Sequence, residues 1–98
     1  MAAPLKLEWS AAALADLDRF AAFLHDTHPL LARMVASEIL EKAQVIATHP
    51  ELGRLIAGQG NYREVLLQAL NATYAFRYRY DGKRLVMLRV FHGRELRE

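Results

Sequence analysis

The chain has 98 residues, of which 53% are hydrophobic and 24% charged, so it fits one small globular domain and is unlike a disordered chain. It has no cysteine, no secretory signal and no run of roughly 20 apolar residues, which excludes disulfides, cysteine-bound zinc, thiol catalysis and a membrane span. We therefore expect a cytoplasmic protein with no membrane partner. The formal net charge is +2, but residues 1–53 carry −3 and residues 54–98 carry +5, with arginine as eight of the nine basic residues there. This asymmetry predicts an anionic partner, because guanidinium groups bind carboxylates and phosphates in a fork.

The first predicted elements are a short strand and an amphipathic helix. Residues 5–9 alternate between apolar and polar side chains, which favours a strand, and Ser10 is suited to cap the helix that follows. Apolar side chains then recur at three- and four-residue intervals, with Phe20 beside them, and we expect Asp16 to face elsewhere. The members of this stripe are Leu14, Leu17, Ala21 and Leu24.

A second helix follows a break at Thr27-His28-Pro29, where the proline fits the first turn of a new helix. Its apolar stripe ends at Thr48-His49-Pro50 and consists of Leu31, Val35, Ile39, Ala43 and Ile46. Two long helices joined by so short a break predict an antiparallel hairpin.

The remaining residues favour strands. Residues 51–60 read as a glycine-rich loop, and the apolar period then changes to two along 62–68, 73–80 and 83–92. We therefore predict an α+β domain over residues 1–98. An N-terminal strand and a helix hairpin precede a three-stranded antiparallel meander, which forms one small sheet packed on the helices.

The Asp81-Gly82 pair predicts the register of the last hairpin. A two-residue turn there places Tyr80 opposite Lys83 and Tyr78 opposite Leu85. The face toward the helices then carries Tyr74, Phe76, Tyr78, Leu85, Met87, Phe91 and, as a charged exception, Arg89. The other face carries Ala75, Arg77, Arg79, Arg84, Val86, Leu88, Val90 and His92. An apolar centre beside an arginine cluster is typical of an interaction surface.

Several short motifs lie along this pattern in a characteristic order. Trp9 precedes a helix with Ala15-Asp16-Leu17, and residues 49–54 read His-Pro-Glu-Leu-Gly-Arg. Residues 62–65 read Tyr-Arg-Glu-Val, residues 74–78 read Tyr-Ala-Phe-Arg-Tyr, and residues 89–94 read Arg-Val-Phe-His-Gly-Arg. In order and spacing, over nearly the whole chain, they resemble the ParE/RelE superfamily of bacterial toxins, on the side of ParE, the plasmid-stabilisation toxins.

The resemblance implies a toxin of a type II toxin-antitoxin system. Its antitoxin, a ribbon-helix-helix or similar protein, would be encoded beside it and would wrap it with a flexible acidic or amphipathic segment. ParE members poison DNA gyrase and arrest growth, whereas RelE members cut mRNA on the ribosome. The resemblance implies no cofactor and no sequence-specific DNA binding by the toxin itself.

The nuclease alternative can be tested residue by residue. RNA cleavage needs a base, an acid and several cations around one phosphate. Arg63 matches a basic position of RelE-type nucleases, but Ala75 and Glu95 stand where those nucleases tend to carry basic residues. His92 is by residue type a candidate acid–base group, although a strand-end histidine is the simpler interpretation. We therefore assign no catalytic residue.

We predict a ParE-like toxin that acts by binding, with a RelE-like mRNA interferase or an inactive antitoxin-binding relic as alternatives. His25 and His28 have the spacing of a metal pair, but no further ligands cluster with them, so we expect no metal site. The residues predicted to contact target or antitoxin are Arg63, Arg77, Arg79, Arg84, Val86, Leu88, His92 and Arg94.

Overall fold

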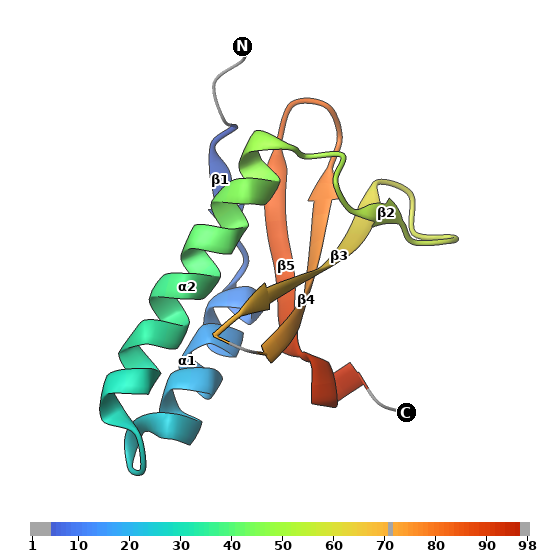
Figure 1. Cartoon of the computed structure of the whole chain (residues 1–98). Coiled ribbons are helices and arrows are strands. Elements are labelled where there is room, and N and C mark those ends of the chain that lie inside the picture. Colours follow the sequence, from blue (N-terminus) through green and yellow to red (C-terminus); the bar gives the residue numbers. More distant parts are fainter. Residues whose placement is uncertain (1–4, 71, 97–98) are drawn as a thin grey trace.

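A computed structural model describes residues 5–70 and 72–96 and arranges them as a mixed sheet with two helices on one face (Figure 1). The elements are β1 (Leu7–Trp9), α1 (Ala11–His25), α2 (Pro29–Thr48), β2 (Arg54–Leu55), β3 (Tyr62–Ala69), β4 (Ala72–Tyr80), β5 (Leu85–His92) and the 3₁₀ turn η1 (Gly93–Leu96). The predicted α+β class, with an N-terminal strand, a helix hairpin and an antiparallel meander, is confirmed.

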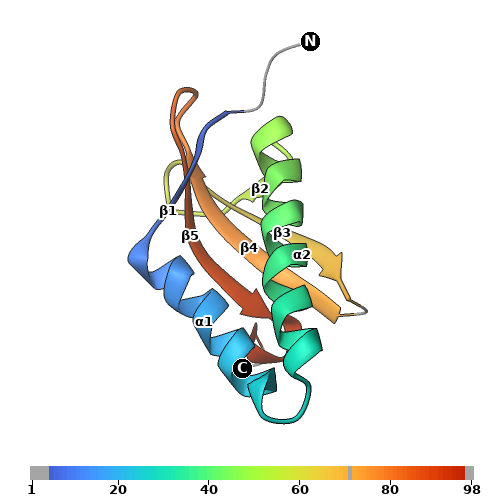
Figure 2. The ribbon, with the colours of Figure 1, turned by 90° about the vertical axis from the view of Figure 1, so that its left-hand side faces the viewer.

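The sheet is larger than the predicted meander. Its strand order is β1-β5-β4-β3-β2, with β1 parallel to β5 and the other pairs antiparallel. The short strand β2 lies inside the segment predicted as a loop, because two residues show no alternation to recognise. Figure 2 shows both helices on the same side of the sheet, so no element among the described residues covers the opposite face.

The apolar stripe of α2 forms one half of the core, as predicted. Val35, Ile39 and Ile46 are buried against Phe76 and Tyr78 of β4. Fully burying a side chain of this size contributes roughly 1.5–3 kcal/mol, so a few such residues supply much of the stability of a small domain. The core therefore lies between α2 and the centre of the sheet.

The predicted register of the β4–β5 hairpin is wrong. Tyr80 pairs with Leu85 rather than with Lys83, so the loop comprises residues 81–84 instead of two residues. The Asp81 side chain explains the difference, because its Oδ1 accepts hydrogen bonds from the backbone N–H groups of Lys83 (2.9 Å) and Arg84 (2.8 Å). These bonds stabilise a longer turn than the Asp-Gly pair alone predicts.

A β-bulge in β5 shifts the register once more. Tyr78 pairs with Met87, but the next residue along β4 toward its start, Arg77, pairs with Arg89, which leaves Leu88 as the extra residue. Because side chains alternate along a strand, an extra residue sends every later side chain to the opposite face.

The assignment of four side chains to faces was therefore wrong. Val90 and His92 lie on the helix side of the sheet, where Val90 is fully buried. Arg89 and Phe91 lie on the other face, with the Arg89 guanidinium 4.6 Å from the centre of the Phe91 ring. The charged exception expected in the core is thus absent from it.

The buried face of α1 also differs from the predicted stripe. Leu14 is 49% exposed, whereas Asp16, which was expected to face elsewhere, is only 1% exposed. The Ser10 side chain accepts a hydrogen bond from the Ala13 N–H at 3.0 Å, so the predicted N-cap is confirmed. Ser10 also donates to the Leu88 carbonyl at 3.0 Å, which fixes the start of α1 at the bulge.

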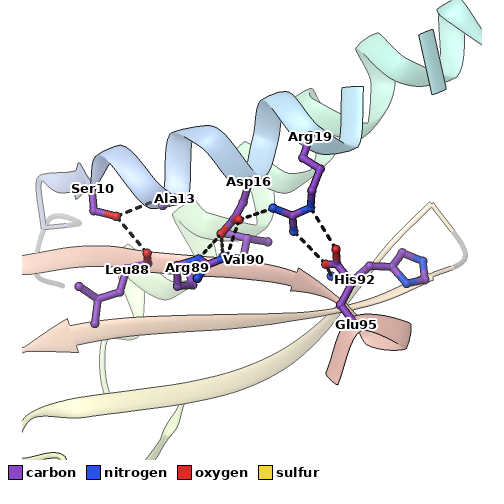
Figure 3. Close-up of polar contacts among 9 residues, drawn as sticks. All are labelled: Ser10, Ala13, Asp16, Arg19, Leu88, Arg89, Val90, His92 and Glu95. Carbon is purple, nitrogen blue, oxygen red and sulfur yellow. Dashed lines mark hydrogen bonds and ion pairs between the residues drawn. The ribbon is translucent and has the colours of Figure 1, made fainter. Parts of the chain in front are cut away.

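Asp16 joins α1 to β5 (Figure 3). Its carboxylate accepts hydrogen bonds from Arg89 Nε (2.9 Å) and Arg89 Nη2 (3.0 Å), from the Val90 N–H (2.8 Å) and from Arg19 Nη1 (2.5 Å). Burial acts to raise the pKa of Asp16, but these hydrogen bonds outweigh it and lower the pKa below its ordinary value of 3.8. A buried carboxylate with this many donors is stable only as the anion.

We expect Asp16→Asn to lower the free energy of unfolding by about 3 kcal/mol, because it leaves two guanidinium groups without their shared carboxylate. Urea denaturation at neutral pH measures the loss, and Asp18→Asn, on the exposed side of α1, is the matched control. Because the folded pKa of Asp16 lies below 3.8, its contribution is present above that pH and is lost as the pH falls through the folded value. The wild type and Asp16→Asn should therefore become equally stable in acid. A difference in their free energies of unfolding that persists there would contradict the role given to the Asp16 carboxylate.

Candidate functional site

The eight residues predicted to bind a partner lie in three separate regions. The first region is the sheet face that α1 and α2 leave uncovered, which we call the open face and which carries Arg77, Arg79, Val86, Arg89 and Phe91. Arg84 and Leu88 lie beside it, at the end of the β4–β5 loop and at the bulge. Arg63 forms a second region, and His92 and Arg94 belong to a third.

The centre of the open face holds stacked arginines. Arg77 Nε lies 2.5 Å from Glu64 Oε2, and the guanidinium of Arg77 lies 5.1 Å from the centre of the Phe91 ring. Arg89 contacts the same ring, so one phenyl group supports two cations. Ala75 is fully buried next to them and brings no functional group to this surface.

The end of the open face nearest the β4–β5 loop holds a second ion pair. Arg84 donates from Nε (3.1 Å) and Nη2 (2.8 Å) to the two carboxylate oxygens of Glu8. This hydrogen bonding lowers the pKa of Glu8 and raises the pKa of Arg84. Arg79 is engaged more weakly, since its nearest acidic contact is Asp81 Oδ2 at 4.0 Å. The carboxylates of a partner therefore have to displace Glu64 from Arg77 and Glu8 from Arg84, or they have to bind at Arg79.

Arg63 lies on the helix side of the sheet, opposite Tyr78, and not on the open face. Its Nη1 donates to the carbonyls of Gly53 (2.6 Å) and Glu51 (3.3 Å). The Tyr78 hydroxyl donates to the Pro50 carbonyl (2.8 Å) and accepts from the Gly53 N–H (2.7 Å). These bonds hold the segment between α2 and β2, so Arg63 supports the fold at this position.

The close packing of the segment between α2 and β2 also explains why residue 53 is a glycine. A Cβ atom on Gly53 would lie 2.8 Å from the Tyr78 hydroxyl and 3.0 Å from the Glu64 backbone. Only glycine fits that close approach. The glycine of the Pro-Glu-Leu-Gly-Arg motif is therefore required by packing against β3 and β4.

His92 and Arg94 border a groove that the apolar pattern of the sequence does not indicate. The groove has a volume of about 690 Å³ and lies between α1, the start of α2, the β3–β4 turn and η1. The His92 ring packs edge-on against Tyr74, with ring centres 5.2 Å apart, and its Nδ1 accepts the Arg94 N–H at 3.1 Å. The one sequence signal for this groove was Phe23, which lies outside the apolar stripe of α1 and is 83% exposed.

Among residues 5–70 and 72–96, no group of three or more His, Cys, Asp or Glu side chains is placed to hold a metal ion. His25 Nδ1 instead lies 3.4 Å from Asp26 Oδ1, with both side chains exposed. Within the part of the chain that the structure describes, no helix is long and apolar enough to cross a membrane.

Comparison with known proteins identifies the class. The family described as ParE toxin of the type II toxin-antitoxin system, parDE, matches residues 7–97. The chain belongs to this family, so it is a toxin of a type II toxin-antitoxin system in the ParE/RelE superfamily. No curated protein matches it.

Solved structures of toxin-antitoxin systems share the fold. The chromosomal ParDE toxin-antitoxin system of P. aeruginosa superposes with a TM-score of 0.71 at 22% identity, covering 90% of this chain and 95% of that one. The toxin-antitoxin complex RelBE2 of Mycobacterium tuberculosis superposes with a TM-score of 0.66 at 19% identity, covering 92% and 99%. At these identities the likeness establishes the fold alone.

We expect Arg63→Met to lower the free energy of unfolding by about 2 kcal/mol, because it removes charged hydrogen bonds to two backbone carbonyls. Chemical denaturation measures the change, and Arg54→Met, an exposed arginine on the neighbouring strand, should shift stability by less than about 0.5 kcal/mol. Unchanged stability of Arg63→Met together with lost partner binding would instead assign Arg63 to a binding surface.

Proposed function

We propose that this toxin poisons DNA gyrase by binding it, without catalysis of its own, and that a cognate antitoxin neutralises it in the cytoplasm. Membership of the ParE family supports the choice of gyrase. The antitoxin would be a ribbon-helix-helix or similar protein with an acidic, amphipathic segment, and the arginines of the toxin support that complementarity.

The observation that carries this proposal is the dispersal of the cations that a nuclease would need together. Arg63 donates to backbone carbonyls on the helix side of the sheet, while Arg77 and Arg79 lie on the open face. Glu95 is bound to Arg19 on yet another side. Cleaving a phosphodiester requires several positive groups around one phosphate, so this distribution favours binding over phosphoryl chemistry.

The open face offers chemistry suited to a protein partner. It combines apolar surface at Phe91 and Val86 with arginines held in place by neighbouring acids or by the Phe91 ring. Arginine and aromatic side chains are enriched at protein interfaces, and pre-oriented guanidinium groups lose little freedom on binding. Gyrase and the antitoxin are the two partners that would compete for such a surface.

Expression of the chain alone is expected to arrest growth, and co-expression of the cognate antitoxin is expected to restore it. In a reconstituted reaction, the purified toxin should inhibit supercoiling and increase gyrase cleavage complexes. Unaltered gyrase with codon-phased mRNA cuts on ribosomes would show an mRNA interferase instead. No growth effect at all would show an inactive relic.

A double variant tests the open face. Replacing Arg77 and Arg79 by glutamine should raise the toxin concentration that half-inhibits gyrase by about tenfold or more, because both cations lie on the proposed interface. The variant with Arg33 and Lys42 of α2 replaced by glutamine loses the same charge away from that face and should act like the wild type. An equal loss of gyrase inhibition in both variants would show that net charge, and not the open face, causes the effect.

A further inference from the structure

Beside the groove, the Glu95 carboxylate accepts hydrogen bonds from a guanidinium group and from the backbone. Arg19 donates from Nε to Glu95 Oε2 and from Nη2 to Oε1, both at 3.0 Å, and the His92 N–H donates to Oε1 at 2.7 Å (Figure 3). A guanidinium with two parallel bonds and a backbone N–H are donors that select a carboxylate. The chain therefore fills a carboxylate-binding subsite with its own side chain.

Arg19 is held in position by contacts that do not involve Glu95. Its Nη1 binds the buried Asp16 carboxylate at 2.5 Å, and its guanidinium lies 4.9 Å from the centre of the Phe20 ring. If Glu95 left, Arg19 would remain oriented toward the groove. The subsite is thus preformed for another carboxylate.

Glu95 is well placed to be exchanged. The Arg19 side chain is 41% exposed and that of Glu95 is 35% exposed, and ion pairs this open to water stabilise a fold only weakly. Glu95 belongs to η1, a turn of four residues, so its release disrupts no long helix or strand. Asp16, the other carboxylate on Arg19, is by contrast almost fully buried.

The adjoining groove adds an apolar requirement. Phe20, Leu24, Leu31 and Tyr74 line it, and Phe23 stands at its rim with 83% of its surface exposed. An aromatic side chain this exposed beside an apolar groove is typical of a protein-binding site. An occupant must therefore bring apolar side chains next to a carboxylate.

We infer that the groove binds an acidic, apolar segment of the cognate antitoxin, and that a carboxylate of this segment displaces Glu95 from Arg19. Glu95 thus holds the subsite in the free toxin and leaves it in the complex. This inference rests on neutralisation by an antitoxin, which is part of the proposed function, but not on gyrase as the target.

Glu95→Gln tests the exchange. The purified antitoxin from the neighbouring reading frame is titrated against each toxin variant by calorimetry. Removing the competing anion should tighten binding by about fivefold, the ratio expected for one half-exposed ion pair. Glu41→Gln is the matched control, because it changes net charge equally at an exposed position of α2 that lines neither the groove nor the open face. It should leave the affinity unchanged.

Arg19→Gln should weaken binding, and in that background Glu95→Gln should have no further effect. Thermal melts check folding, since Asp16 keeps its bonds to Arg89 and Val90. An unchanged or weakened affinity of Glu95→Gln, or an equal gain from Glu41→Gln, would overturn the inference and leave the gyrase proposal intact.

Phe23→Ser tests the groove independently of Arg19. It should weaken antitoxin binding by about tenfold or more, as expected for an aromatic anchor, without lowering the melting temperature. Leu30→Ser is the control, because Leu30 is 65% exposed on α2 but does not line the groove. Equal affinities of the two variants would overturn the groove as the docking site, whereas normal gyrase inhibition by both would show that the target surface lies elsewhere.

Discussion

The attachment of α1 to β5 through Asp16 is the constraint on which the rest of the structure depends. The parallel strand β1 pairs with β5 only as far as Met87. Beyond that point the backbone of β5 bonds to side chains of the α1 segment, with Ser10 binding the Leu88 carbonyl and Asp16 the Val90 N–H. These side chains take the place of a neighbouring strand, so an edge that would otherwise be open is closed by a helix.

The same carboxylate orients an arginine on each of two surfaces. Arg89 reaches Asp16 while its guanidinium stacks on Phe91 at the open face. Arg19 reaches Asp16 from α1 and binds Glu95 beside the groove. The two candidate binding surfaces therefore share one buried anion, and its ionisation is a condition for both.

Elements with a strong local pattern could be predicted from the sequence. The stripe of α2 and the three strands of the meander followed from apolar periods, and Ser10 from its side chain. The buried face of α1 could not be predicted, because an aspartate in a helix reads as exposed unless its partner Arg89, 73 residues away, is known. The prediction of the hairpin register was wrong for a related reason. Neither the hydrogen bonds of the Asp81 side chain nor the bulge at Leu88 changes the alternation of apolar and polar residues in the sequence.

The candidate site could be predicted in residue type but not in placement. The excess of arginine shows in which half of the sequence positive charge is concentrated, but it does not reveal that Arg77, Arg84 and Arg19 already hold carboxylates of the same chain. The consequence is chemical as well as geometric. A free cationic cluster would attract any polyanion, whereas arginines oriented by their own acids bind a partner whose carboxylates replace those acids at matching positions. Recognition by this toxin would then depend on the geometry of exchange more than on its net charge.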